Sequence, residues 1–451
     1  MLRLFLFSIA LMTPAWGAQA FRAGMARMDI TPARAIWMSG YANRNKPSEG
    51  VAQKLWAKAL VMEEKRVKTV IVSSDLIGLP RAVSDVVAAR VAKAYGIDRA
   101  HLLLNSAHTH SGPAVRPNLD TMYFDIKNAD RQVLDEYALQ LVENLVTVVG
   151  AAIADLAPAR MAIGHGTAGL GANRRVLSPT GVRFGVHKPG PVDHDVPVIS
   201  VRSPEGKLRG VMFAYACHNT TLGGDFYQIH GDYAGYAQAE VESRHPGATA
   251  MFLLLCGADQ NPEPRNKLEN AVAHGKELGA AVEKVLDGGM KPFVPSLKAA
   301  WQTIDLKFAS HSRETFEKEK LSKNKFEAFR ARTMLKAYDE GRPVRRVPYP
   351  VQAIRLSKNI AMVALGGEVV VDYALRAKKE FAGTDLIVAG YSNEVMCYIA
   401  SKRILKEGGY EAVASMVYYN QPGPLSEEVE DDIFASIHKV LTRVGVKAGK
   451  R

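Results

Sequence analysis

Short apolar runs alternate with amphipathic stretches along most of this chain of 451 residues. Runs of strand length lie at 68–75, 101–104, 160–164, 196–202, 210–217, 248–256, 351–356, 359–365 and 386–389. Helical spacing occurs at 81–95, 130–156, 267–286, 313–340, 370–381 and 426–444, and another helix is expected to end near Arg244. Such short runs between turn residues are typical of strands buried on both faces. The alternation, without sequence repeats or linkers, predicts one large α/β domain with a mixed β-sheet flanked by helices.

Turn and capping residues mark several boundaries of these elements. Gly96 follows the 81–95 stretch and favours the left-handed conformation that ends a helix. Ser357 and Lys358 separate two apolar runs and predict a hairpin. Ser426 is of a residue type that favours N-cap positions, so we expect the last helix to begin there.

Polar residues follow four of the apolar runs directly. His108, His218, Asp259 and Glu368 each lie in the turn after such a run. Ligands of α/β sheets bind at strand ends. If these four ends converge, they form a site.

The turn at 105–113, Asn-Ser-Ala-His-Thr-His-Ser-Gly-Pro, contains two histidines two positions apart. His108 and His110 would point the same way at a strand end, because side chains alternate there with a period of two. Imidazole nitrogen is a common zinc ligand, so the pair fits a ligand and an acid–base partner. A polar turn with two solvated histidines explains the pair equally well, since the HExxH motif of zinc helices is absent from the sequence.

The first twenty residues have the pattern of a signal peptide. Arg3 precedes an apolar run at 4–12, and Ala18-Gln19-Ala20 resembles a cleavage site. We therefore expect residues 1–20 to be removed, residues 21–451 to form the mature domain, and the protein to be exported to the periplasm or secreted. No later uninterrupted apolar run approaches the roughly 20 residues that a membrane span requires.

Charge and cysteine content narrow the choice of partners. The formal net charge is +12, which scattered surface lysines explain, although the dense mixed-charge stretch at 313–346 could favour an anionic surface. We find no nucleic-acid-binding motif. The three cysteines, Cys217, Cys256 and Cys397, are too few and odd in number for a disulfide framework, and each ends an apolar run. Buried thiols are expected, with a bridge between Cys217 and Cys397 as the alternative.

Several short motifs occur in a fixed order along the mature chain. They are Ala23-Gly24 with Thr31-Pro32, Met38-Ser39-Gly40-Tyr41, the HTHSGP turn at 108–113, Asn173-Arg174, His218, Asp232, Gly367-Glu368, Gly390-Tyr391-Ser392-Asn393, Tyr398, and Tyr410-Glu411-Ala412. Each motif is weak alone. Together and in this order they resemble the neutral (non-lysosomal) ceramidases, specifically the N-terminal catalytic domain of that family.

The resemblance implies a zinc-dependent hydrolase that cleaves an N-acyl amide bond, as in a ceramide-like lipid, with a zinc-activated water molecule. The implied zinc ligands are His108, His218, Glu368 and Tyr398. His110 would be an acid–base or hydrogen-bonding group, while Tyr410 and Arg174 would stabilise the tetrahedral oxyanion. The residues expected to support the ligands or line the pocket are Asp232, Asp259 and His230.

Two features depart from the family pattern. The family carries Gly-Asp-x-Ser-Pro-Asn where this chain has Gly257-Ala258-Asp259-Gln260-Asn261-Pro262, so the family serine falls at Gln260. A covalent serine mechanism is therefore not expected, and Gln260 could instead donate a hydrogen bond to substrate. The immunoglobulin-like C-terminal domain of the full-length family members is not expected here, and residues 313–350 resemble no segment of the family.

The sequence leaves the substrate and the oligomeric state open. Zinc chemistry of this type would also suit an N-acyl sugar or an ester, since loops around the pocket determine the substrate. A metal-containing binding protein without catalytic activity is the alternative from another class.

Overall fold

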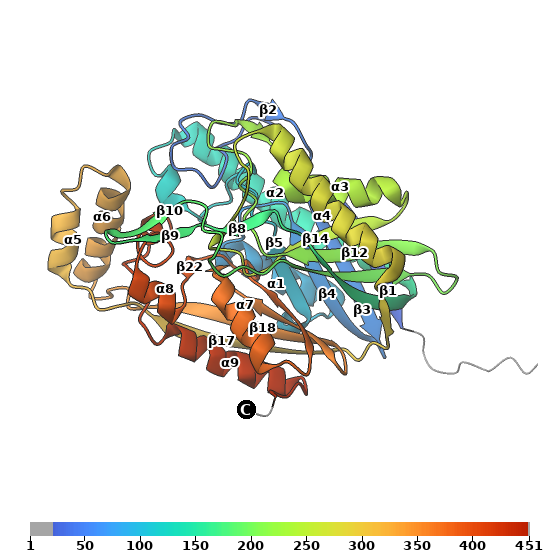
Figure 1. Ribbon diagram of the computed structural model, residues 1–451. Helices are drawn as coiled ribbons and strands as arrows, with labels where there is room; N and C mark the ends of the chain where they lie inside the picture. Colours follow the sequence, from blue (N-terminus) through green and yellow to red (C-terminus); the bar gives the residue numbers. More distant parts are fainter. Residues whose placement is uncertain (1–20, 450–451) are drawn as a thin grey trace, which may run out of the picture.

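Residues 21–449 of the computed structural model form a mixed α/β fold with three major sheets rather than one (Figure 1). The predicted signal peptide, residues 1–20, lies outside the described residues. The first sheet contains β1 (Arg22–Asp29), β3 (Trp56–Glu64), β4 (Val67–Ser74), β5 (Leu102–Ser106) and β6 (Ala157–Pro158). The second contains β7 (Arg160–Thr167), β11 (Asp195–Arg202), β12 (Leu208–Tyr215), β14 (Thr249–Leu254) and β16 (Lys291–Phe293). The third contains β17 (Lys298–Lys307), β18 (Arg346–Ser357), β19 (Ile360–Leu365) and β21 (Asp385–Ala389).

The same chain path occurs three times, once for each sheet. Three antiparallel strands are followed by a helix, by a fourth strand parallel to the third, and by another helix. The helices are α1 (Arg81–Tyr95) and α2 (Asn128–Ala154), α3 (Asp232–Arg244) and α4 (Leu268–Gly288), and α7 (Val371–Glu380) and α9 (Val429–Arg443). The sequence shows no repeat, because this path depends on where apolar residues stand and not on which ones they are.

The inner faces of the three sheets meet in one apolar cluster. In β3, Leu60 and Met62 join this central cluster, whereas Ala59 and Val61 point the other way, toward α1 and α2. The second and third sheets alternate in the same way, and their outer faces are covered by α3 and α4 and by α7 and α9. Both faces of the central strands are therefore buried, which explains their continuous apolar runs.

The ends of three strands, one from each sheet, are joined by the side chain of Asn105 in β5. Its amide nitrogen donates to the carbonyl oxygens of Leu254 (3.2 Å) and Gly390 (2.9 Å) and to the Ser392 hydroxyl (3.2 Å). Its amide oxygen accepts from the Leu254 N–H at 2.9 Å. Asn105 is buried, so these bonds replace all contact with water.

Shorter elements connect and cover the sheets. The short strands are β2 (Gly50–Val51), β8 (Gly171–Asn173), β9 (Arg175–Ser178), β10 (Gly181–Phe184), β13 (Gln228–Ile229), β15 (Gln260–Pro262), β20 (Glu368–Val369) and β22 (Tyr398–Ile399). The short helices are α8 (Lys402–Glu407) and the 3₁₀ turns at Arg99–His101, Asp120–Tyr123 and Ala414–Val417. Within these, β20 pairs in parallel with β22, and β15 pairs antiparallel with β8.

The sequence contains no uninterrupted apolar run of membrane-spanning length after the predicted signal peptide, yet the helix α2 is long and largely apolar. Among the described residues it is the helix that is long and apolar enough to cross a membrane by length and composition alone. In this structure it packs against β1 and β3 through Leu134, Leu141 and Leu145, in the cluster that covers the first sheet. A helix in the core of a folded protein has the same length and composition as a membrane-spanning one.

Two local predictions are wrong. The stretch 313–340 forms two antiparallel helices, α5 (Arg313–Glu319) and α6 (Lys325–Asp339), and α6 begins where the Asn324 side chain accepts from the Phe326 N–H. Folding back lets Phe316 pack on Met334 and Leu335, which one straight helix would expose. The last helix begins at Val429 and not at Ser426. The prediction of buried thiols is confirmed for all three cysteines, and the alternative, a bridge between Cys217 and Cys397, is wrong.

Three long strands, β1, β3 and β17, were also not predicted from the sequence. In β3 a lysine interrupts the apolar pattern, yet Lys58 is buried. Its ammonium group donates to Glu242 and to the carbonyl oxygen of Ala250, both at 2.7 Å. A buried lysine with such partners is rare, and so the pattern did not predict a strand.

We expect Asn105→Leu to lower the free energy of unfolding by about 3 kcal/mol, because the Leu254 N–H and two carbonyl groups would lose their buried partners. Denaturant titration followed by circular dichroism measures this change. The exposed Asn128→Leu serves as the control, with an expected effect within about 0.5 kcal/mol. Equal stability of the two variants would show that Asn105 does not hold the three sheets together.

Candidate metal centre and active-site pocket

Two histidines at strand ends present the same nitrogen to a common point. His108 follows β5, with a positive φ of 63°, and its Nδ1 is bonded to the carbonyl oxygen of Ile77. His218 follows β12, and its Nδ1 lies 2.9 Å from the carbonyl oxygen of Gly257. A carbonyl oxygen only accepts hydrogen bonds, so Nδ1 carries the proton in both rings. Each Nε2 is therefore left with a free lone pair when the ring is neutral.

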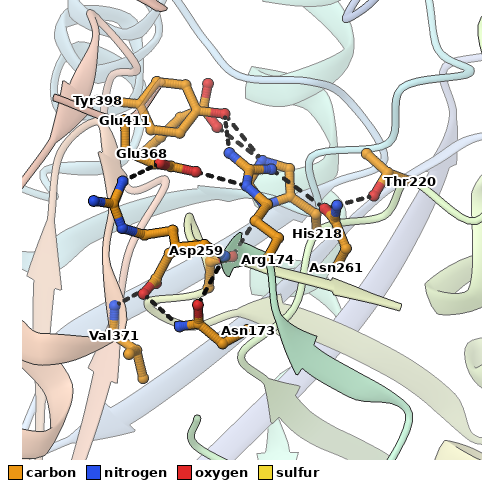
Figure 2. A network of polar contacts seen from close by, with 12 residues as sticks. Asn173, Arg174, His218, Thr220, Asp259, Asn261, Glu368, Val371, Tyr398 and Glu411 are labelled. Carbon is orange, nitrogen blue, oxygen red and sulfur yellow. Dashed lines mark hydrogen bonds and ion pairs between the residues drawn. The ribbon is translucent and has the colours of Figure 1, made fainter. Parts of the chain in front are cut away.

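The two Nε2 atoms converge on the carboxylate of Glu368. Oε2 of Glu368 lies 3.1 Å from Nε2 of His108 and 3.0 Å from Nε2 of His218. The Tyr398 hydroxyl lies 3.2 Å from the same nitrogen of His218. Glu368 and Tyr398 are neighbours because β20 and β22 pair with these two residues in register. The predicted ligands therefore form one buried group, of which Figure 2 shows His218, Glu368 and Tyr398.

The charges of this group fit a divalent cation. Burial, with Arg174 nearby, lowers the pKa of His218 to about 4, so its ring is neutral at physiological pH. Glu368, whose Oε1 accepts from the Tyr419 hydroxyl, carries the usual negative charge of a carboxylate at neutral pH. A neutral imidazole lone pair thus faces an ionised carboxylate at hydrogen-bonding distance. Two acceptors in this arrangement suit a bound cation, and nitrogen and oxygen ligands of these types suit zinc.

His110 lies between this buried group and the pocket. Its Nε2 is 3.2 Å from Nε2 of His108, and ligand nitrogens of His108, His110 and His218 all lie within 4.8 Å of one another. The ring packs on Tyr41 with centroids 4.8 Å apart. Burial and the two other histidines hold the pKa of His110 well below its usual range. The geometry therefore suits His110 either as a neutral proton acceptor or as a further metal ligand.

Arg174 connects the ligand group to the pocket wall. Its Nε donates to Glu411 at 2.8 Å, and its two terminal nitrogens donate to Asn261 (3.2 Å) and to the Tyr398 hydroxyl (3.1 Å). Figure 2 shows Arg174, Glu411 and Tyr398 pointing toward one another. Burial opposes the charge, but Tyr398 and Glu411 outweigh it and hold the pKa of Arg174 well above its usual range. This guanidinium group is a permanent, fixed positive charge beside the candidate ligands.

Asp259 forms hydrogen bonds with residues next to the candidate ligands and not with a histidine. Its carboxylate accepts from the Asn173 side chain at 3.0 Å and from the Val371 N–H at 2.9 Å, contacts that Figure 2 also shows. Its carbonyl oxygen accepts from the Arg174 N–H at 2.9 Å. Burial raises the pKa of Asp259 to about 6. Asp259 thus connects the Asn-Arg motif to the start of α7, which follows Glu368.

The structure places three other predicted residues away from the pocket wall. The carboxylate of Asp232 accepts from the N–H groups of Leu222 and Tyr233, which shapes the loop after His218. His230 accepts from the Asp232 N–H at 2.8 Å and is fully buried. Gln260 is also buried, and its side-chain oxygen accepts from the Asp193 N–H at 3.3 Å. Its carbonyl oxygen accepts from the His218 N–H, so in this structure Gln260 supports a histidine through its backbone.

A cavity of about 640 Å³ opens onto this group. Its wall includes His110, Arg174, Tyr398 and Tyr410 of the predicted site. Other aromatic residues of the wall are Tyr41, Phe184 and Tyr418, and the other polar ones are Asn173, Thr220, Asn261, Glu263, Arg265 and Asn266. The Tyr410 ring lies 5.4 Å from that of Tyr398 and 4.9 Å from that of Phe184. Aromatic and polar groups therefore dominate this wall.

Two residues of the site were not predicted from the sequence. The Tyr419 hydroxyl donates to Oε1 of Glu368, the carboxylate oxygen that does not face the histidines. Glu411 pairs with both Arg174 and Arg175. Glu411 lies within the Tyr-Glu-Ala motif, which could have suggested a role. No spacing in the sequence connects Tyr419 to Glu368.

Comparison with known proteins agrees with this fold and motif order. Residues 21–285 match the family described as "Neutral/alkaline non-lysosomal ceramidase, N-terminal". The matched residues are more than half of the chain. The chain belongs to this family. The resemblance predicted from the motifs is therefore confirmed.

The chain is similar to curated and solved proteins of that name. It is 28% identical over 278 residues to a neutral ceramidase of Pseudomonas aeruginosa, covering 57% of this chain and 40% of the relative. It is 27% identical over 243 residues to a neutral ceramidase of Mycobacterium tuberculosis, covering 50% and 36%. The matched parts thus span less than half of these relatives.

Two solved structures show the same fold. The crystal structure of the Pseudomonas aeruginosa neutral ceramidase matches with a TM-score of 0.71 and 20% identity, over 96% of this chain and 76% of that one. A structure described as ceramidase complexed with C2 matches with a TM-score of 0.73 and 19% identity, with the same coverage.

We expect His218→Ala to bind at least ten-fold less zinc than the wild type, because it removes a nitrogen that faces Glu368. Inductively coupled plasma mass spectrometry of the purified proteins measures zinc per chain. His245→Ala removes a histidine whose ring pairs with Glu283 on α4, and it is expected to keep its zinc. Retention of zinc by His218→Ala would remove this residue from the ligand set.

Proposed function

We propose that this chain is a zinc-dependent amidohydrolase of the neutral ceramidase type, with His108, His218, Glu368 and Tyr398 as the zinc ligands. One observation carries the proposal: two Nε2 atoms, with their protons held elsewhere by backbone carbonyls, face one ionised carboxylate. Catalytic zinc can expand from four ligands to five, so these four protein groups would still leave a position for water or substrate. The neighbouring cavity gives substrate access to this group.

Bound zinc would supply Lewis acidity, which polarises an amide carbonyl and lowers the pKa of a water molecule. The chain's own residues supply the remaining functions. Arg174 and Tyr410 stand in the cavity wall and stabilise the oxyanion that forms on the carbonyl oxygen. Tyr410 is protonated at neutral pH, since burial raises the pKa of its hydroxyl above the usual value, and so it can donate a hydrogen bond.

His110 is the proton carrier in this proposal. It is the histidine of the cluster that lines the cavity, and its depressed pKa keeps the ring neutral at physiological pH, with one nitrogen lone pair unprotonated. Protonation of the leaving amine, which completes amide cleavage, is then assigned to the same ring. Glu411 holds Arg174 in position, and Tyr419 holds Glu368.

The substrate that family membership favours is an N-acyl amide such as a ceramide-like lipid. The cavity wall also supports a second candidate, a deacylase or esterase that acts on a non-lipid N-acyl compound, because aromatic and polar side chains dominate it. A metal-containing protein that binds such compounds without turnover is the rival from another class. Export to the periplasm or the medium, and contact of the basic 313–346 segment with an anionic surface, remain predictions from the sequence.

Removal of the metal and removal of one hydroxyl test this mechanism. Chelation of purified protein should abolish hydrolysis of a short fluorogenic N-acyl-sphingosine, and added zinc should restore it.

Tyr410→Phe should keep its zinc and lose at least ten-fold in kcat, because the missing hydroxyl stabilises only the oxyanion.

The control for Tyr410→Phe is Tyr95→Phe, a tyrosine at the end of α1 outside the cavity wall. Normal turnover by Tyr410→Phe would remove Tyr410 from the mechanism. A zinc-loaded wild type without activity on any amide or ester would favour the binding protein.

A further inference from the structure

Two arginines in the cavity wall have different partners. Arg174 has a carboxylate partner, Glu411, at 2.8 Å, which it shares with Arg175. Arg265 donates to the carbonyl oxygen of Thr220 at 2.7 Å and to the Tyr41 hydroxyl at 3.4 Å, both neutral groups. Within residues 21–449, no carboxylate oxygen lies within 4 Å of Arg265 as an ion-pair partner. A guanidinium group has five N–H donors, so Arg265 keeps both a positive charge and donors for a ligand.

Hydrogen bonds fix the backbone on both sides of Arg265. The Asn266 N–H donates to the carbonyl oxygen of Thr221 at 2.7 Å, which joins this loop to the one after His218. From α4, the Asn270 side chain donates to the carbonyl oxygen of Arg265 at 2.9 Å, and His274 bonds to that of Pro264 at 2.8 Å. A loop fixed in this way loses little further conformational entropy when it binds a ligand.

Another part of the cavity wall is formed by aromatic rings and is shared with a second cavity. Phe184 and Tyr410, whose ring centroids are 4.9 Å apart, line both cavities. The second cavity has a volume of about 690 Å³, and its wall includes the apolar residues Val182, Val413 and Ala414 beside the charged Arg175, Arg183 and Glu411. An alkyl chain that passes Tyr410 could therefore stay in contact with apolar side chains beyond the first cavity.

We propose that Arg265 binds an anionic group, such as a carboxylate, on the amine part of an N-acyl amide whose acyl chain lies along Phe184 and Tyr410. The inference rests on the proposed function and names the substrate class of the same cavity. Glu263 also belongs to the wall, but its side chain is exposed and forms no ion pair with Arg265. The family motif that this chain lacks, at 257–262, directly precedes the loop that carries Arg265. A changed loop beside the pocket is consistent with a changed substrate.

The test compares two substrates of equal chain length in the zinc-loaded protein. N-lauroylglycine carries a carboxylate on its amine part, and N-lauroylethanolamine carries a neutral hydroxyl. We expect the wild type to show at least ten-fold higher kcat/KM for N-lauroylglycine, mainly through a lower KM, since a charge-assisted pair with arginine strengthens binding. Arg265→Gln should lower this preference at least ten-fold. Arg265→Lys keeps the charge and should retain most of the preference.

Arg332→Gln, an exposed arginine on α6, serves as the matched control and should keep the wild-type preference. Equal kcat/KM for the two substrates in the wild type would overturn the inference while the proposed hydrolysis stands. An unchanged preference in Arg265→Gln would also overturn it. If Arg265→Lys folds and retains the preference, the effect of Arg265→Gln is due to the lost charge and not to a lost structure.

Binding of keto analogues separates this inference from the proposed hydrolysis. In these compounds a CH₂ group replaces the amide N–H, so no amide is present to be cleaved. Calorimetry should show at least ten-fold tighter binding of the keto acid than of the keto alcohol, and Arg265→Gln should abolish the difference. This result without hydrolysis of either amide would support Arg265 and contradict the proposed function. Equal binding of the two analogues would contradict the inference.

Discussion

Asn105 joins the ends of three strands that belong to three different sheets. Its single side chain bonds to Leu254 of the second sheet and to Gly390 and Ser392 after the last strand of the third. The candidate metal centre depends on this junction, because its residues also come from all three sheets. His108 follows β5, His218 follows β12, and Glu368 follows β19. These groups come within hydrogen-bonding distance only when the three sheets are packed together with their strand ends side by side.

The backbone around the junction also determines what the side chains can do. Carbonyl oxygens of Ile77 and Gly257 hold the Nδ1 protons of the two histidines, so both Nε2 atoms face Glu368. Pairing of β20 with β22 brings Tyr398 beside Glu368. The candidate ligands thus form a buried polar floor, while His110, Arg174, Tyr410 and Arg265 stand in the open wall above it. In the proposed function, this division would separate metal binding from substrate binding within one site.

The sequence predicted those features that depend on residues close together in the chain. Most strands of the three major sheets and most helices were found, since apolar runs and turn residues such as Gly96 mark them locally. The ordered motifs indicated the family, and the structure brings His108, His218, Glu368 and Tyr398 together. The division into three sheets was not predictable, because a strand buried on both faces has the same pattern in one large sheet or in three smaller ones.

Residues that act across sheets were also missed or misplaced. Tyr419 bonds to Glu368 across 51 positions, and no spacing in the sequence indicates such a contact. Gln260 was considered as a hydrogen-bond donor to substrate; its side chain is buried, and its oxygen accepts from the Asp193 N–H. Lys58 interrupts an apolar pattern, and the strand around it was overlooked because its partners, Glu242 and Ala250, lie far along the chain. Each difference arises from a tertiary contact that overrides a local pattern.

Anomalous diffraction at the zinc absorption edge, from crystals of the purified protein, would locate the metal directly. We expect one strong peak about 2.0–2.3 Å from Nε2 of His108, Nε2 of His218 and an oxygen of each of Glu368 and Tyr398, with His110 outside this distance. A peak bonded to His110 in place of Glu368 or Tyr398 would contradict the assigned ligand set. A zinc-loaded crystal with no peak at this group would contradict the metal centre itself.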